Sequence, residues 1–187
     1  MKKTKLLFGL IAGFGFNLAL AQDTDSEPHN VVISAPEIAI LDIESTNTLD
    51  LSFSLDASGL ESGEEFIIDE ENNDLWINYT SLVATSSSQR SITIESSSVP
   101  SIAGLTLTVL ASAHSGNGGG NIGTPTTVVT PSATPANIIT GIGSAYTGDG
   151  NSNGHNLTYY LDFNGDFGDL NVSDAAANIS MTYTITD

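Results

Sequence analysis

Hydrophobic and polar residues alternate along much of the chain with the two-residue period of β-strands. The clearest run is residues 48–55 (TLDLSFSL), where every second residue is Leu or Phe. The same period predicts strands over residues 75–83, 90–95, 105–111, 126–130, 137–142, 155–163 and 178–186. No segment has a convincing helical period. The sequence therefore predicts an all-β fold, an antiparallel immunoglobulin-like or pilin-like β-sandwich of about eight to ten strands.

Segments rich in Gly, Asn and Asp separate these runs and predict turns and loops. Residues 69–74 (DEENND) read as an acidic turn, and residues 148–154 as a loop. Residues 112–125 contain His114 and the run GNGGGN. A packed element does not normally tolerate so much glycine, which predicts a long linker there.

The most apolar stretch after the leader is residues 30–44 (NVVISAPEIAILDIE). It predicts a strand interrupted at Pro36, and residues 38–41 are apolar at both parities, which is typical of burial on both faces. We expect Ile38, Ile40 and Leu41 to fill a core by β-strand addition, in their own domain or in a neighbour. Both alternatives fit the sequence.

Residues 1–21 have a basic start, an apolar middle and small residues before Gln22, the pattern of a cleaved signal peptide. We expect a disordered acidic lead-in over residues 22–29 and a single β-sandwich domain over residues 30–187. The signal implies export through the general secretory route to the extracellular space or cell surface, with the periplasm as an alternative. No later apolar run is long enough to predict a transmembrane helix in the mature chain.

Without the leader the chain keeps one basic residue, Arg90, against 22 acidic residues, a net charge of −21. Nucleic acids and anionic lipids need basic patches on their partners and are therefore excluded as expected ligands. Cations or a basic protein surface fit this charge better. The chain has no cysteine, so no disulfide stabilises it.

Residues 162–169 (DFNGDFGD) place side-chain oxygens at alternate positions around a glycine turn. Asp162, Asn164, Asp166 and Asp169 are the candidate calcium ligands, because Ca²⁺ prefers several oxygen ligands. The stretch lacks the closing Glu of a twelve-residue calcium loop. A hairpin turn with solvated carboxylates is the alternative. Calcium is thus the one candidate cofactor, and the fold is not expected to require it.

Two aromatic residues, Trp76 and Tyr160, are candidates for a glycan-binding face. Trp76 shares its parity with residues that look outward in the strand predicted over residues 75–83. The alternative places Trp76 between the sheets, and general burial tendencies favour that alternative.

The sequence also predicts that the protein is not an enzyme. Its three histidines show no metal-ligand spacing to one another. Ser112 and Ser115, near His114, belong to a glycine-rich stretch that is not expected to hold a catalytic site rigidly.

Several stretches carry a resemblance: the leader ending in Ala-Gln, PEIAILDIE, LWINYTS, SIAGLTLTV and MTYTITD. They resemble small secreted surface proteins of Bacteroidetes bacteria and, more remotely, WxL-type and spore-coat-U/fimbrial (pilin-like) β-sandwich domains. Residues 76–79 (WINY) lack the Trp-x-Leu of the WxL group, so its cell-wall attachment is not implied.

The resemblance implies a surface module rather than an enzyme. We expect an exported, non-enzymatic cell-surface protein, either an adhesion module or an extracellular filament subunit. Its partner would be another protein or further copies of itself, joined by β-strand addition. The alternative is a calcium-dependent carbohydrate-binding module, whose partners would be glycans.

Overall fold

A computed structural model describes residues 28–54, 56–97, 104–163, 165–170 and 178–186. The signal peptide expected over residues 1–21, and the lead-in except for residues 28 and 29, lie outside these ranges. The chain divides into two units, residues 1–34 and 35–187. In the first unit the described residues 28–34 are exposed and form no strand.

The second unit contains ten described strands. Their bounds are β1 (Ile38–Ser45), β2 (Asp69–Leu82), β3 (Arg90–Ser96), β4 (Leu105–Ala111), β5 (Gly119–Gly120), β6 (Thr124–Pro125), β7 (Ala136–Ile142), β8 (Ala145–Tyr146), β9 (His155–Phe163) and β10 (Met181–Thr186). A short 3₁₀ helix, η1 (Phe167–Asp169), follows β9.

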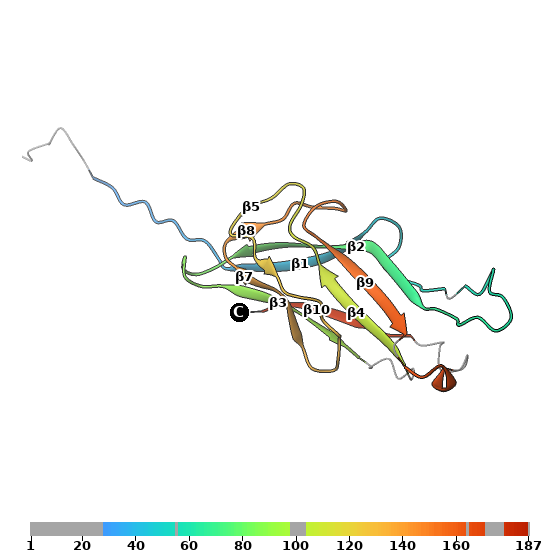
Figure 1. Ribbon diagram of the computed structural model, residues 1–187. Coiled ribbons are helices and arrows are strands. Elements are labelled where there is room, and N and C mark those ends of the chain that lie inside the picture. Colours follow the sequence, from blue (N-terminus) through green and yellow to red (C-terminus); the bar gives the residue numbers. More distant parts are fainter. Residues whose placement is uncertain (1–27, 55, 98–103, 164, 171–177, 187) are drawn as a thin grey trace, which may run out of the picture. The chain divides into compact units, whose positions relative to one another are not determined.

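The strands form two antiparallel sheets (Figure 1). Sheet A has the order β4-β9-β2-β8-β5, and β1 pairs with the other side of β2. Sheet B has the order β10-β3-β7-β6. The prediction of an all-β, antiparallel sandwich is confirmed. The described residues include no helix of the length and apolarity needed to cross a membrane.

The core lies between the sheets, because alternate residues of the long strands point inward. Ile77 and Leu157 of sheet A and Ile92 and Ile94 of sheet B are fully buried. Each such side chain contributes roughly 1.5–3 kcal/mol when it is removed from water.

Two predicted strands are absent. Of residues 48–55, the described residues 48–54 pair with no strand, although Leu51 and Phe53 contact the core. Leu49 is 62% exposed. Residues 126–130 form one isolated bridge at Val129. Both strand predictions are wrong. The alternation of apolar residues indicates which side chains pack against the core, but a strand also needs a neighbouring segment with unpaired backbone groups.

The acidic turn predicted at residues 69–74 is also wrong, since these residues begin β2. A β-bulge between Asn72 and Leu75 interrupts the pairing with β9. Asn156 Nδ2 braces it by donating to Asn73 O at 2.7 Å and Leu75 O at 3.1 Å. The clustered carboxylates are tolerated because most of their side chains are exposed to solvent.

The linker predicted at residues 112–125 is packed against its neighbours. Gly119 and Gly120 form β5 and pair with β8. A methyl group on Gly118 would lie 2.6 Å from His114 Nε2 and 2.9 Å from Tyr146 O. The glycines here allow close approach, so the expectation of a loose segment is wrong.

Candidate functional site

Sheet A ends on one side at β1, which pairs with no described strand except β2. In an antiparallel pair, alternate residues direct both backbone polar groups toward the partner, and those between direct theirs away. Thr46 N–H donates to Asp74 O across the pair at 3.0 Å. The N–H of Ile43 is instead bound by Asp42 Oδ1 at 2.8 Å. Ala39, Leu41 and Ile43 therefore present their backbone groups at the outer edge of β1.

The start of β1 is held by Arg90, the first residue of β3 in sheet B. Arg90 is 5% exposed, and its Nη2 lies 2.8 Å from Glu37 Oε2. Its Nη1 donates to Ile38 O at 3.0 Å. The Glu37 side chain is 55% exposed, so solvent screens the ion pair. Arg90, the only Lys or Arg among the described residues, thus ties the edge strand to the opposite sheet.

The residues predicted to act in strand addition, Ile38, Ile40 and Leu41, all lie in β1. Leu41 packs against the core and Ile38 is half-buried, but Ile40 is 63% exposed. The expected burial of residues 38–41 on both faces is therefore wrong, because sheet B covers only the inner face of β1. Within this chain β1 pairs with β2 along eight residues, and strand addition to a partner stays a prediction.

The opposite edge of sheet A, at β4, is covered by the chain itself. Val109 N–H donates to Val129 O, and Val129 N–H donates to Val109 O, both at 2.8 Å. Pro125 and Pro131 lie on either side of this contact in sequence, and Pro131 is fully buried. An incoming strand could not pair at Val109 without displacing this segment.

The structure places both candidate glycan-binding aromatics on the outer face of sheet A. Trp76 lies opposite Asn156, and Tyr160 lies opposite Glu71 and Thr108. Both aromatic side chains are half-buried. Trp76 is outside the core cluster, so its placement between the sheets is wrong. The bulge that could have turned it inward lies before it along the strand. Glycan binding stays a prediction.

The candidate calcium ligands span the end of β9 and η1. Asp162 is in β9, Asp169 is in η1, and Asn164 lies outside the described residues. Asp166 Oδ1 accepts from Gly168 N–H at 2.9 Å and caps η1. In the described parts of the chain no three His, Cys, Asp or Glu side chains gather as a metal site. Calcium binding stays a prediction.

Sequence reasoning missed a buried polar network at the start of β9. His155 is fully buried, and its Nδ1 lies 2.8 Å from Ser112 O. Because a carbonyl oxygen only accepts, Nδ1 carries the proton and Nε2 accepts from Tyr79 Oη at 3.1 Å. Burial lowers the pKa of His155 and raises the pKa of Tyr79 to about 12. The signal in the sequence was the parity that His155 shares with inward-facing Leu157.

Further contacts of this network join two loops, residues 112–118 between β4 and β5 and residues 147–154 between β8 and β9. His114 Nε2 lies 3.1 Å from Thr147 O, and the His114 and His155 rings meet edge to face at 5.9 Å. Asn117 N–H donates to Asn153 Oδ1 at 2.8 Å. The two loops therefore brace each other, and the His155 ring itself is fully buried.

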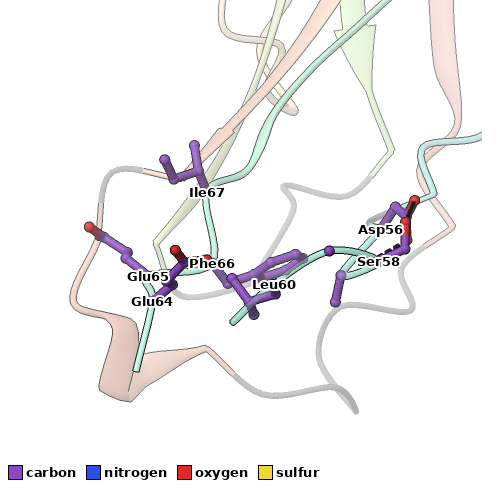
Figure 2. Close-up of a pocket in the computed structure, with 9 residues that line it drawn as sticks. Asp56, Ser58, Leu60, Glu64, Glu65, Phe66 and Ile67 are labelled. Atoms are coloured by element: carbon purple, nitrogen blue, oxygen red, sulfur yellow. Dashed lines mark hydrogen bonds between the residues drawn. The ribbon is translucent and has the colours of Figure 1, made fainter. Parts of the chain in front are cut away.

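A shallow hollow of about 250 Å³ lies in the loop before β2. Figure 2 shows the hydrogen bonds between Asp56 and Ser58 at one part of the hollow, with Leu60 and Phe66 among the other lining residues. Hydrogen bonds from the Ser58 hydroxyl and N–H lower the pKa of Asp56. These bonds hold the Asp56 carboxylate within its own turn.

Comparison of the chain with protein-family models, curated proteins and solved structures found no match.

Proposed function

We propose that the protein is an exported, non-enzymatic cell-surface protein that acts in adhesion or as an extracellular filament subunit. The interaction is β-strand addition at the outer edge of β1. One observation carries this proposal: the outer edge of β1 has no backbone partner among the described residues, whereas the segment around Val129 covers the edge at β4. Unpaired edges of this kind are templates for another strand.

The leader and the acidic composition support an exported surface role. The interior supports a non-enzymatic one, because the most perturbed histidine, His155, is fully buried and engaged at both ring nitrogens. A catalytic base must reach the proton that it removes.

A matched pair of substitutions tests strand addition. Ile40 and Leu110 lie on the outer face of sheet A, in the edge strands β1 and β4. Cells exporting the Ile40→Lys variant should lose adhesion or surface filaments, because a charge at β1 repels or misaligns the incoming strand. Cells exporting Leu110→Lys should retain them. Electron microscopy and adhesion assays of these cells give the readout, and equal behaviour of both variants would reject the proposal.

Glycan binding is a second candidate, favoured by the shared face of Trp76 and Tyr160. Aromatic rings offer apolar faces for packing, and neighbouring hydroxyl and amide groups supply hydrogen bonds. A glycan array with the wild-type chain and Trp76→Ala tests this candidate. Repeating the array with calcium and with a chelator tests whether residues 162–169 contribute.

A further inference from the structure

The outer edge of β1 carries a chemical pattern that specifies its partner, and the inference rests on strand addition at β1. Ala39 and Leu41 offer backbone N–H and C=O groups that no described residue binds. Ile43 offers its C=O, while its N–H is held by Asp42. An incoming strand therefore meets alternating donors and acceptors along this edge.

The outer face of this edge is acidic. Asp42 and Glu44 share one face of β1, and neither is in an ion pair with a described residue. Arg90, the only Lys or Arg among the described residues, contacts Glu37 instead. Basic side chains of an incoming strand would lie opposite these carboxylates, where opposite charges stabilise cross-strand pairs.

The inner side of the edge is apolar. Leu41 and Ile43 are half-buried and contact the core, and β1 also contacts β10 of sheet B. Inward side chains of an added strand would extend this packing, so they must be apolar. The edge thus fits a strand in which basic and apolar residues alternate.

A second copy of this chain is a poor occupant. Two β1 strands paired antiparallel near their centres would bring Asp42 against Asp42 or Glu44 of the other copy, and like charges directly opposite are destabilising. The exported chain has a net charge of −21 and no Lys to supply the missing cation.

We propose that β1 binds an extended segment of a different protein, with Lys or Arg opposite Asp42 and Glu44 and apolar residues at the alternate positions. On binding, the Asp42 carboxylate turns from Ile43 N–H to the basic side chain. Ile43 N–H then pairs with the added strand. The Asp42 carboxylate therefore binds the Ile43 N–H until a basic side chain of the partner takes its place as the partner of Asp42.

The test uses the exported chain and a capped peptide as long as β1, eight residues, with alternating Lys and Val. Calorimetry measures binding, and amide hydrogen exchange locates it. The Lys/Val peptide should bind and protect Ala39 and Leu41, and a Glu/Val peptide should not bind. Neutralising the edge with Asp42→Asn and Glu44→Gln should weaken binding about tenfold.

Ala39→Pro provides the deciding control, because an acidic protein attracts any cationic peptide weakly. This variant removes one outward N–H and no charge, and Pro is tolerated on the free side of an edge strand. It should lose binding of the Lys/Val peptide while the thermal midpoint stays close to that of the wild type. Unchanged binding to Ala39→Pro would overturn the proposal.

Other occupants give different results, each of which also rejects the basic partner. A peptide of residues 28–35 that binds as tightly as Lys/Val would identify the segment of this chain itself. Protection of Ala39 that rises with protein concentration alone would identify a second copy. If the Lys/Val peptide fails to bind but Ile40→Lys still abolishes adhesion or filaments, the basic partner is rejected and strand addition stands.

Discussion

The sandwich has a histidine end, where β4 leads into its loop and β9 begins, and an apolar end, where β4 begins and β9 finishes. At the histidine end, His155 and Thr147 are fully buried among hydrogen-bonding partners. At the apolar end, Ile67 is 77% exposed and Phe167 is 52% exposed. Both ends are built from loops that look equally open in the sequence.

The difference between the ends lies in what closes each one. A buried polar group must find a partner, so the histidine end fixes its loops through specific bonds. The apolar end has a small cluster around Ile68 and Leu105, with the Phe163 and Phe167 rings edge to face at 6.4 Å. These apolar contacts are less directional than hydrogen bonds. We therefore expect substitutions at the histidine end to cost more.

The largest effect is expected for His155→Leu, which removes the partner of the buried Tyr79 hydroxyl and of the Ser112 carbonyl. The free energy of unfolding should fall by about 3 kcal/mol. Phe167→Leu at the apolar end should cost less than about 1 kcal/mol, since its side chain is half in solvent. Urea denaturation of both variants measures the contrast, and equal losses would contradict it.

The next effect concerns two glycines that lack a positive φ. Gly118→Ala should cost about 2 kcal/mol, because its new methyl would press on the His114 ring and Tyr146 O. Gly168→Ala is the matched control at the apolar end, where the nearest atom to the methyl is Asp166 Oδ1 at 3.4 Å. It should change stability by less than about 0.5 kcal/mol. Thermal unfolding distinguishes the two.

A smaller, pH-dependent effect follows from the lowered pKa of His155. In the unfolded chain the pKa of His155 is 6.5, so below pH 6.5 the unfolded chain binds a proton at this residue. The buried ring of the folded chain stays neutral until the pH reaches its lower, folded pKa. Stability present above pH 6.5 should therefore be lost as the pH falls toward the folded pKa. The loss is up to about 1.4 kcal/mol per pH unit.

His155→Asn isolates this slope, because it removes the titrating ring and its amide can still donate to Ser112 O. His29→Gln is the control, since His29 lies outside the strand-bearing unit. Denaturation between pH 5 and 7 should show the slope in His29→Gln and a weaker slope in His155→Asn. Identical slopes in both variants would show that His155 does not titrate as described.

The smallest effect is expected for Ile67→Thr at the apolar end. Its side chain is mostly in solvent, so stability should change by less than about 0.5 kcal/mol. A larger loss on calorimetric unfolding would mean that this end is more tightly packed than its exposed residues indicate.

Strands with two suitable neighbours could be predicted from the sequence. The predicted ranges 105–111 and 155–163 coincide with β4 and β9, since β9 is paired on both sides and β4 pairs with β9 and meets Val129. The alternation in residues 48–55 is equally regular, yet residues 48–54 pair with no described strand. The local pattern specifies which side chains pack inward, whereas pairing depends on segments far away in sequence.

The candidate site at the edge of β1 likewise depends on pairing between segments that are far apart in sequence. An apolar strand near residue 38 could be predicted, but its position at a sheet edge depends on where β9 and β8 pair with β2. The packing of Gly118 left no local signal, because its close neighbours come from other parts of the chain. The inward parity of His155 could be read from the sequence, since His155 shares it with Leu157.

Arg90 also determines how proteases that cut after Lys or Arg act on residues 6–187. This part of the chain offers such enzymes a single bond, Arg90–Ser91, inside β3, which is paired on both sides. Because the Arg90 side chain is 5% exposed, cleavage requires β3 to open first. Trypsin digestion should therefore leave residues 6–187 of the folded chain whole, and division of this part into two fragments would report how often the sandwich opens.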